Sequence, residues 1–402
     1  MNPTDQPVVF VTRRGAERWR LGHPWIFRDD VRAGSPTADG DIVTVAEAPA
    51  PARPGGGPAW PPRPIGQAFW SDGSKISLRM ITRSLDPIDE SWWRRRIGEA
   101  IAWRETVVAP GDACRLLSAD ADGIPGLIVD RYGEHLVLQS LIPGTDRLRL
   151  LFARIAADAS GASSVLARND PAVRLLEGLP RQIEPLISET PEIVEAREGE
   201  IVYLADLRGG QKTGAFLDQR ENRAAAARLC RGRVADLFCY HGSFALHAAR
   251  RAESVVAVDS SSAAIERGRQ NAALNRIEGI EFLEDNVFDY LRRQERAGDR
   301  FDAIFLDPPA FAKSRADVPA ALRAYKEINL RALKLLRAGG FLFTSSCSYN
   351  LSEDAFLEVL RAAAADSGRS PRILERRGAA ADHPALLGLP ESRYLKCVFL
   401  RV

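Results

Sequence analysis

The 402-residue sequence predicts an α/β fold, with a doubly wound parallel sheet in its second half and two smaller domains before that sheet. Three observations lead to this prediction. The stretch VADLFCYHGSFALHAA, from Val234 to Ala249, has the pattern of a buried strand, a tight turn and a helix. Further strand-and-turn units follow it, and acidic residues stand at the ends of their strands. The first 84 residues, in contrast, consist mainly of short strand-like runs.

Length and composition set broad limits on the protein. A chain of 402 residues exceeds one typical core, and a net charge of +2 neither requires nor excludes a nucleic-acid partner. The five cysteines are scattered, without a C-x-x-C pair or a histidine at ligand spacing, so we expect no disulfide framework and no metal. No signal peptide and no membrane span is predicted, which favours a soluble, cytoplasmic protein. The sequence leaves open whether the chain forms a homodimer.

Residues 1–84 are predicted to form a small β-barrel module. Its Pro- and Gly-rich segment from Ala48 to Pro64 is typical of an exposed loop. In the segment HPWIFRDDV we expect Trp25 and Phe27 to fill the core, because large aromatic side chains are usually buried in so small a domain. The alternative is that the module as a whole binds RNA. The expected strands are Val8–Val11, Asp41–Ala46, Gly66–Phe69 and Ser77–Ile81.

Residues 85–200 are predicted to form a central α+β domain. A helix is expected over Ile88–Arg104, and its three arginines, Arg94–Arg96, suit a solvated face with one snorkelling member better than a phosphate clamp. The run Leu116–Leu141 predicts a hairpin with its turn at Gly133. A helix over Asp146–Ala159 and a strand over Ser163–Arg168 follow. No chemistry is evident in this domain.

Residues 201–402 carry the chemistry. The segment GGQKTGAFLDQRENRAAAARL becomes helical from about Asp218, with Asp218 and Glu221 in the first turn, where carboxylates suit the helix dipole. One interpretation is an ordinary capped helix before the first strand of the sheet. The other is a lid over the amino-acid end of a cofactor.

The turn after the first strand discriminates between cofactors. A dinucleotide fold uses the pattern G-x-G-x-x-G so that a helix N-terminus can approach a pyrophosphate. Here the turn has only Gly242, so a cofactor without phosphate fits better, and S-adenosylmethionine is the usual one for such a sheet. Asp236 could receive the methionyl ammonium group, or it could be a turn or capping carboxylate.

The next two strands also end in acidic residues. Asp259 lies about 20 residues beyond the glycine turn, where an acidic side chain can bind both ribose hydroxyls. Ser260–Ser262 are expected to cap the following helix. Asp285 and Asn286 end the third strand, and such a pair can hydrogen-bond the adenine edge. Together these strand ends favour a nucleoside-containing cofactor more strongly than any one of them.

The fourth strand runs into Asp307, Pro308 and Pro309, at the edge of the sheet where substrates bind in such folds. Enzymes that methylate an exocyclic amine usually have an aromatic residue directly after a proline pair. Here Ala310 follows and Phe311 comes one residue later, so amino-group methylation is disfavoured but not excluded.

The fifth strand supplies a nucleophile candidate, Cys347, at its exposed end. Carbon-5 of a pyrimidine is too poor a nucleophile to accept a methyl group unaided, and enzymes of this type first add a thiolate to carbon-6. The alternative is that Cys347 is a small buried hydrophobic residue. Its place at the edge beside the cofactor favours the catalytic interpretation.

Six segments carry a family resemblance: HPWIF, DGIPGLIVDRYG, QKTGAFLDQRENR, DLFCYHGSF, LDPPAFAKS and SSCS. With them the chain resembles the bacterial S-adenosylmethionine-dependent 23S rRNA cytosine-5 methyltransferases, which join an N-terminal PUA domain to a Rossmann-like catalytic domain. The resemblance covers nearly the whole chain. It implies a PUA-like domain over 1–84, a central domain over 85–200 and a class I methyltransferase domain over 201–402. It also implies that the first two domains help to hold large-subunit rRNA and that Cys347 is the nucleophile.

The resemblance also implies a set of site residues. Asp307 would support catalysis, and Phe311 and Lys313 would contact the substrate. Gly242-Ser243 and His241 depart from the usual turn, and the base that removes the carbon-5 proton is left open between Asp307, Lys313 and water. Two other functions stay open: guanine N7 or N2 methylation without a covalent step, and non-catalytic RNA binding by a methyltransferase fold. The implied cofactor contacts are Phe216, Asp218, Arg220, Asp236, Phe238, Gly242, Asp259, Ser260, Asp285, Asn286, Asp307 and Pro308.

Overall fold

The computed structural model describes residues 6–49, 62–312 and 314–402. The chain divides into two compact units. The first comprises Met1–Val194, Ala205–Ala215 and Asp382–Ser392, and the second comprises Glu195–Leu204, Phe216–Ala381 and Arg393–Val402. Two short segments distant in sequence therefore complete the first unit. The domain boundaries at 84 and 200 stay predictions.

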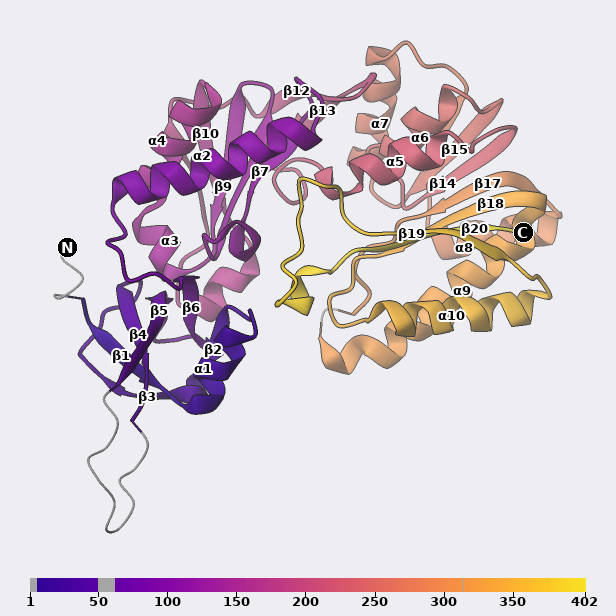
Figure 1. The fold of residues 1–402 in the computed structure, drawn as a ribbon. Coiled ribbons are helices and arrows are strands. Elements are labelled where there is room, and N and C mark those ends of the chain that lie inside the picture. Colours follow the sequence, from indigo (N-terminus) through magenta and orange to yellow (C-terminus); the bar gives the residue numbers. More distant parts are fainter. Residues whose placement is uncertain (1–5, 50–61, 313) are drawn as a thin grey trace. The chain divides into compact units, whose positions relative to one another are not determined.

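The N-terminal part of the first unit contains a six-stranded sheet with the order β2-β6-β5-β4-β1-β3 (Figure 1). The four predicted strands are confirmed as β1, β4, β5 and β6, whereas α1, β2 and β3 were not predicted. The elements are β1 (Val8–Val11), α1 (Arg13–Arg20), β2 (Trp25–Phe27), η2 (Arg28–Asp30), β3 (Val31–Gly34), β4 (Ile42–Glu47), β5 (Arg63–Trp70) and β6 (Ile76–Thr82).

The prediction that Trp25 and Phe27 fill the barrel core is wrong. Ile26, between them, is completely buried in the core of this sheet, whereas Trp25 and Phe27 are partly exposed. Successive side chains of a strand point to opposite faces, so when Ile26 faces the core its two neighbours face away from it. Trp25 instead donates its indole N–H to Asp120, at 3.0 Å, and the Phe27 ring lies 4.7 Å from the Arg18 guanidinium.

The predicted loop from Ala48 to Pro64 extends too far at its C-terminal end. Arg63 and Pro64 already belong to β5, where they pair with Glu47 and Ala46 of β4. Residues 50–61 of the loop lie outside the described residues. The register of the hairpin therefore ends the loop two residues earlier than the composition suggested.

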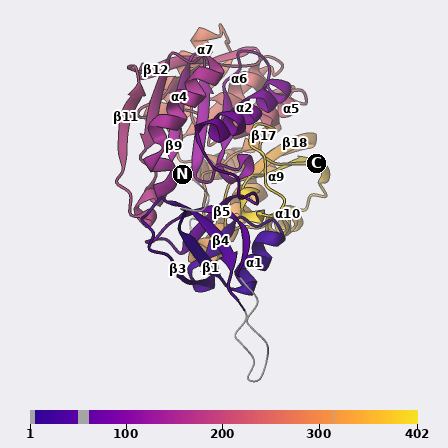
Figure 2. The same ribbon diagram turned by 60° about the vertical axis from the view of Figure 1, so that its left-hand side comes forward.

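The rest of the first unit is built on a five-stranded sheet with the order β11-β10-β9-β8-β7. Helices α2 and α4 lie beside each other and share its hydrophobic core (Figures 1 and 2). The predicted hairpin is confirmed, because β8 and β9 pair through Tyr132 and His135. The elements are α2 (Glu90–Val107), β7 (Cys114–Ser118), η3 (Ala119–Asp122), β8 (Leu127–Tyr132), β9 (His135–Ser140), α3 (Pro143–Arg147), α4 (Arg149–Ser160), β10 (Ser164–Asn169), η4 (Ala172–Glu177) and β11 (Gln182–Ile187).

Two details of this region bear on the sequence predictions. The helix expected over Asp146–Ala159 is divided at Leu148 into α3 and α4. In α2, Arg94 and Arg95 are exposed, while the guanidinium of Arg96 lies 5.0 Å from the Trp92 ring. Two of the three arginines thus lie on a solvated face and the third packs along an aromatic ring, as the sequence predicted, and the structure does not test contact with phosphate.

The second unit contains a seven-stranded sheet with the order β16-β15-β14-β17-β18-β20-β19. The first five strands are parallel, and β20 and β19 are antiparallel additions. Its elements are η5 (Leu217–Gln219), α5 (Arg220–Ala227), β14 (Arg233–Leu237), α6 (Ser243–Ala249), β15 (Ser254–Asp259), α7 (Ser262–Leu274), β16 (Ile280–Glu284), α8 (Val287–Ala297), β17 (Phe301–Leu306), η6 (Arg315–Asp317), α9 (Val318–Leu335), β18 (Leu336–Ser346), α10 (Glu353–Ser367), β19 (Arg372–Arg377) and β20 (Lys396–Arg401). The remaining elements are the paired strands β12 (Ile193–Glu198) and β13 (Ile201–Asp206), and the short helix η7 (Pro390–Ser392).

Helices cover both faces of this sheet. Helices α5, α6 and α7 share one core with the strands, and α8, α9 and α10 share another (Figure 1). The chain moves outward from β14 in one direction and then returns to β17 on its other side. This reversal makes the carboxyl ends of β14 and β17 a topological switch point, where ligands bind in open α/β sheets. The predicted α/β fold class is confirmed.

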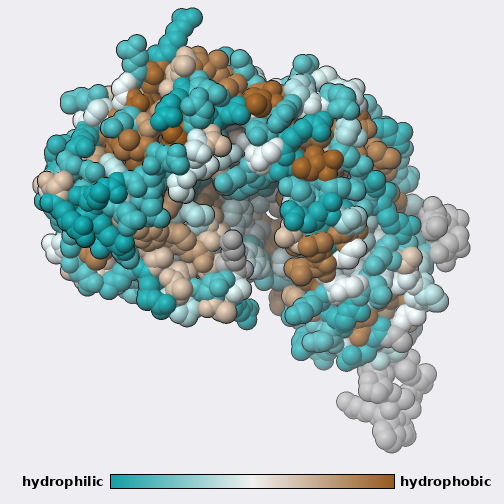
Figure 3. Space-filling view, turned by 180° about the vertical axis from the view of Figure 1, so that it is seen from behind, coloured by the Kyte–Doolittle hydropathy of each residue, from teal (hydrophilic) through white to brown (hydrophobic). Residues whose placement is uncertain are grey.

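Hydrophilic residues cover much of the face of the molecule seen in Figure 3, and hydrophobic patches interrupt them. Within the described ranges, no helix combines the length and the apolar character that a membrane crossing demands.

Candidate functional site

The candidate site lies at the carboxyl edge of the parallel strands of the second unit. Because parallel strands end at the same edge, the sheet brings together residues far apart in sequence. Asp236 lies in β14, Asp259 ends β15, Asp307 follows β17 and Cys347 follows β18. All four were singled out from the sequence. The structure places them on neighbouring strands, and their individual roles stay predictions.

The turn between β14 and α6 has an unusual backbone. Phe238 and Tyr240 adopt positive φ angles of 64° and 50°, and Gly242 has φ 82°. Such angles are uncommon for residues other than glycine and often mark functional turns. A Cβ atom on Gly242 would also lie 2.8 Å from the Phe282 ring, so both conformation and space require glycine there.

Asp236 is completely buried beneath this turn. One carboxylate oxygen accepts a hydrogen bond from the Ala245 N–H at 2.8 Å, in the first turn of α6. The other oxygen, Oδ1, is buried and has no hydrogen-bond partner among the described residues. Burial, with the nearby charges of Asp307 and Asp259, raises the pKa of Asp236 to about 7. Asp236 is thus a capping carboxylate that still has an acceptor to offer.

The next two strand ends organise their own turns. Asp259 accepts hydrogen bonds from the backbone N–H groups of Tyr240, at 2.9 Å, and Ser261, at 3.0 Å. The predicted cap of α7 is confirmed, since the Ser261 hydroxyl accepts from the Ala264 N–H. Ser260 is exposed beside it. Asp259 therefore fixes the first and second turns of the edge relative to each other.

Asp285 and Asn286 follow β16. Asp285 forms an ion pair with Arg293 of α8. The Asn286 side-chain oxygen accepts from the N–H groups of Phe288 and Asp289 and caps α8. Contact with an adenine edge stays a prediction for both residues, and their side chains already serve the helix terminus.

An aromatic cluster lies next to these strand ends. The Phe238 ring is 6.3 Å from the rings of both Phe288 and Phe311, in edge-to-face orientations. Phe311 also lies 4.8 Å from Tyr325 of α9. Phe288 was missed in the sequence, where it reads as one more apolar residue of an amphipathic helix.

The segment before the sheet also reaches this edge. The side chain of Gln219 is buried and donates to Asp307, at 2.9 Å, and to Ser345, at 3.2 Å. Asp218 accepts from the Tyr394 hydroxyl at 2.6 Å. Phe216 lies edge-on to Tyr240 at 5.4 Å, and Arg220 is buried in the first turn of α5. Gln219 was missed because an isolated glutamine carries no chemical signal in a sequence.

Cys347 is the one partly exposed cysteine of the five; the other four are buried. Its Sγ atom lies 3.9 Å from the carbonyl oxygen of Pro308. The flanking residues Ser346 and Ser348 are buried, and each has a hydroxyl 3.0 Å from the Tyr325 hydroxyl. The residues around the thiol are thus tied to α9, and the thiol itself faces the segment that follows β17.

The other predicted substrate residues lie in that same segment. Pro308 is buried, while Asp307 and Phe311 are partly exposed. The Ala312 N–H donates to the Ser348 hydroxyl at 3.2 Å, which joins this segment to the turn that carries Cys347. Lys313 lies outside the described residues.

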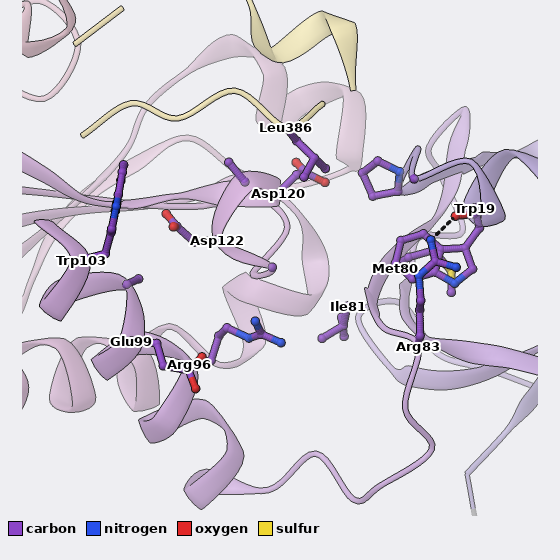
Figure 4. A pocket seen from close by; sticks show the side chains of 15 residues that line it. Trp19, Met80, Ile81, Arg83, Arg96, Glu99, Trp103, Asp120, Asp122 and Leu386 are labelled. Atoms are coloured by element: carbon purple, nitrogen blue, oxygen red, sulfur yellow. Dashed lines mark hydrogen bonds between the residues drawn. The ribbon is translucent and has the colours of Figure 1, made fainter. Parts of the chain in front are cut away.

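A second candidate site is a cavity of about 460 Å³ within the first unit (Figure 4). Arg83 in its wall donates to the carbonyl oxygen of Trp19 at 2.7 Å and lies 4.3 Å from the Trp19 ring. Arg96, Glu99 and Trp103, which is 39% exposed, line the α2 side. Cations beside an accessible aromatic ring are groups that bind unpaired nucleotides.

The single-glycine turn, the acidic strand ends and the strand order define a Rossmann-like methyltransferase domain. Comparison with known families agrees with this. A model described as S-adenosylmethionine-dependent methyltransferase matches residues 148–387, and one described as PUA-like domain matches residues 9–48. The cofactor and the N-terminal PUA-like domain are thereby shown.

Relatives match nearly the whole chain. A protein of Aeromonas hydrophila named ribosomal RNA large subunit methyltransferase I is 37% identical over 390 residues, covering 94% of this chain and 95% of that protein. A protein of the same name from Salmonella arizonae is 34% identical over 402 residues, covering 98% and 97%. The chain belongs to the family of S-adenosylmethionine-dependent methyltransferases that includes these proteins.

Solved structures share the fold. A putative SAM-dependent methyltransferase from Streptococcus mutans has a TM-score of 0.80 at 19% identity and covers 98% of this chain and 100% of its own. A second putative methyltransferase, complexed with SAH, has a TM-score of 0.81 at 18% identity and covers 98% of this chain and 100% of its own.

Proposed function

We propose that this protein transfers a methyl group from S-adenosylmethionine to carbon-5 of a cytosine in large-subunit ribosomal RNA. The observation that carries the proposal is Cys347, a partly exposed thiol at the carboxyl end of β18 that faces Pro308. The names of relatives 34–37% identical to the chain support ribosomal RNA as the substrate. The choice of carbon-5 rests on the thiol, because only that reaction at a pyrimidine needs one.

The residues of the edge fit the cofactor. The unpartnered Oδ1 atom of Asp236 suits an ammonium group, since a buried carboxylate oxygen without a hydrogen bond is costly until a donor reaches it. Asp259 would hold the ribose hydroxyls, and Asp285 with Asn286 the adenine edge. The remaining proposed contacts are Phe216, Asp218, Arg220, Phe238, Gly242, Ser260, Asp307 and Pro308. When bound, the cofactor supplies an electrophilic methyl group.

The chain's own residues prepare the cytosine. The Cys347 thiolate adds to carbon-6, so that a sulfur–carbon bond forms and the ring gains enamine character that makes carbon-5 nucleophilic. Asp307, held by Gln219, hydrogen-bonds the pyrimidine ring in this state. After methylation a base removes the carbon-5 proton, and those electrons expel Cys347 by β-elimination. The cytosine must be unpaired or flipped out to reach the thiol.

The direct test is the Cys347→Ala variant. It should lose methyl transfer to ribosomal RNA completely and keep its affinity for S-adenosylmethionine, because the thiol touches the base and not the cofactor. Transfer is measured with radiolabelled cofactor and affinity by calorimetry. Cys239→Ala, which removes a buried thiol whose pKa is raised well above the ordinary value by burial, is the matched control and should stay active. Full activity of Cys347→Ala would contradict the proposal.

The PUA-like and central domains would hold the RNA, in part through the cavity of the first unit. Arg96 lines this cavity, whereas the adjacent Arg95 is exposed and does not line it. Arg96→Ala should lower the slope of log affinity against log salt by about 1, the loss of one phosphate contact. Arg95→Ala is the control and should keep the wild-type slope, measured by fluorescence anisotropy with a ribosomal RNA fragment. Equal slopes for both variants would show that Arg96 makes no phosphate contact and that the cavity does not bind the RNA.

A further inference from the structure

A buried lysine lies next to the residues that carry the thiol. Lys396 begins β20, and it is only 5% exposed. β20 runs antiparallel to β18, and Lys396 pairs with Ser346, the residue directly before Cys347. Lysine is almost never so deeply buried unless it is paired, so its presence at this position needs a reason.

The ammonium group of Lys396 is fully hydrogen-bonded. It donates to the carbonyl oxygens of Ser348 at 2.7 Å, Leu351 at 2.9 Å and Tyr394 at 2.8 Å. Three acceptors match the three donors of a charged ammonium group, whereas a neutral amine has only two. Two of the acceptors, Ser348 and Leu351, belong to the turn that begins at Cys347. Lys396 therefore holds this turn in place through two of its carbonyl oxygens.

No carboxylate lies within ion-pair distance of Lys396 in the described part of the chain. The nearby Glu353 of α10 is paired with Arg376, at 2.7 Å, and with Arg393, at 3.7 Å. Burial lowers the pKa of Lys396 to about 8, and the charges of Cys347 and Glu353 act in the opposite direction. A buried cation without an anion is costly, and a thiolate at Cys347 would offset that cost.

The other titratable groups around the thiol differ from Lys396 in kind. Tyr325 of α9 is hydrogen-bonded to Ser346 and Ser348, and burial raises its pKa, so it stays neutral. Asp307 after β17 is a carboxyl group, and its charged form opposes a thiolate. Tyr394 donates its hydroxyl to Asp218. Among these groups, all within the described residues, Lys396 is the one that carries a positive charge.

We propose that Lys396 is a positioning residue for Cys347: its ammonium group holds the turn that carries the thiol, and its charge favours the thiolate. The thiol proton leaves to solvent, and the ammonium group keeps its three protons. This inference rests on the proposed function only for the use made of the thiolate. Thiolate formation itself can be measured without RNA and without methyl transfer.

The test is alkylation of Cys347 by iodoacetamide in the full-length protein between pH 6 and 9, followed by peptide mass spectrometry. In Lys396→Met the rate at pH 7 should fall about ten-fold, and the pH of the half-maximal rate should rise by about one unit. Lys326→Met is the control, because Lys326 is 40% exposed on α9 and pairs with Asp366 at 2.7 Å. It should keep the wild-type profile.

A folded Lys396→Met variant with an unchanged melting temperature, unchanged S-adenosylmethionine affinity and the wild-type alkylation profile would overturn the proposal. The wild-type protein gives a second test that needs no substitution. Its half-maximal rate at Cys347 should fall below about pH 8.5, the ordinary pKa of a free thiol, and a value at or above that pH would also overturn it. Loss of RNA methylation or of adduct formation would affect the proposed function and leave both alkylation results standing.

Discussion

The buried carboxylates Glu177 and Asp130 of the first unit differ in their partners from Asp236 at the sheet edge of the second unit. Elsewhere in the second unit, Glu198 is also paired with an arginine, Arg223. In the first unit, Glu177 is buried against Arg79, with oxygen–nitrogen distances of 2.7 and 3.2 Å, and Asp130 is buried against Arg115 at 2.8 and 3.0 Å. In the second unit, Asp236 is buried as deeply, yet within the described residues it forms no ion pair and one oxygen has no hydrogen bond.

An arginine partner within the fold separates Glu177 and Asp130 from Asp236. Removing a carboxylate from water is costly unless a cation and hydrogen bonds compensate it. Arginine compensates Glu177 and Asp130 within the fold itself. Asp236 has no such ion pair among the described residues: its burial is offset in part by the Ala245 N–H and the charge of Arg223, and the proposed function assigns its second oxygen to a positively charged ligand. The methionyl ammonium group of the cofactor has the required charge.

The largest expected effect is on stability. Glu177→Gln leaves the buried Arg79 without its anion, and we expect the free energy of unfolding to fall by about 3–5 kcal/mol. Affinity for S-adenosylmethionine should not change. Glu90→Gln is the control, since Glu90 pairs with Arg94 on the exposed face of α2, and it should leave the free energy of unfolding nearly unchanged. Denaturant unfolding measures both free energies. Equal losses for the two variants would show that the buried pair stabilises the fold no more than the exposed pair does.

Asp236→Asn should weaken cofactor binding and raise the stability of the unliganded protein, the reverse of what is expected for Glu177→Gln. Loss of the anion should weaken S-adenosylmethionine binding about 10–100-fold, the value of a hydrogen bond to a charged group. The unliganded variant should be more stable than the wild type at pH 8, because the raised pKa of Asp236 makes its charged form costly, by at most about 4 kcal/mol. Asp289→Asn, an exposed residue of α8, is the control for both measurements. A destabilised Asp236→Asn protein with normal affinity would mark Asp236 as structural.

Cofactor binding should depend on pH. With a pKa of about 7, Asp236 is protonated below that pH in the unliganded protein and must lose its proton to receive an ammonium group. Affinity should therefore rise up to ten-fold per unit between about pH 5 and 7 and level off above it. In the same range the unliganded protein should lose stability as the pH rises, because the folded state holds the proton more tightly than the unfolded chain. Calorimetry in two buffers would detect the released proton, and a flat profile would contradict this.

The smallest effect is expected at Gln219. Its amide donates to Asp307, and loss of one such hydrogen bond corresponds to about 1 kcal/mol. Gln219→Ala should slow methyl transfer about five-fold, and because the buried side chain also bonds Ser345 and Asn222, it should lower the free energy of unfolding by about 1–3 kcal/mol. Gln270→Ala, at an exposed position of α7, is the control. Equal rates for the two variants would show that Asp307 does not need this support.

Much of the second unit could be predicted because its signals are local. Four of the five parallel strands have an acidic residue at or next to their carboxyl ends, so Asp236, Asp259 and Asp307 could be placed at one edge from order alone. Cys347 could be placed for the same reason. Their contacts with cofactor and RNA stay predictions.

The parts that could not be predicted depend on long-range register. Lys396 reaches the turn that begins at Cys347 only because β20 pairs antiparallel with β18, about 50 residues later in the chain. Gln219 reaches Asp307 across 88 residues. Trp25 and Phe27 were predicted wrongly because a three-residue strand is too short to reveal which of its phases faces the core.

Trapping of a covalent adduct would show whether Cys347 adds to carbon-6 of a cytosine. A ribosomal RNA fragment containing 5-fluorocytosine is incubated with the wild-type protein and S-adenosylmethionine, and the product is analysed by denaturing electrophoresis and mass spectrometry. Fluorine at carbon-5 cannot leave as the proton does, so the bond between Cys347 and carbon-6 should persist and map to the peptide containing Cys347. Methylation of this RNA without any adduct, or an adduct formed equally by Cys347→Ala, would contradict the account.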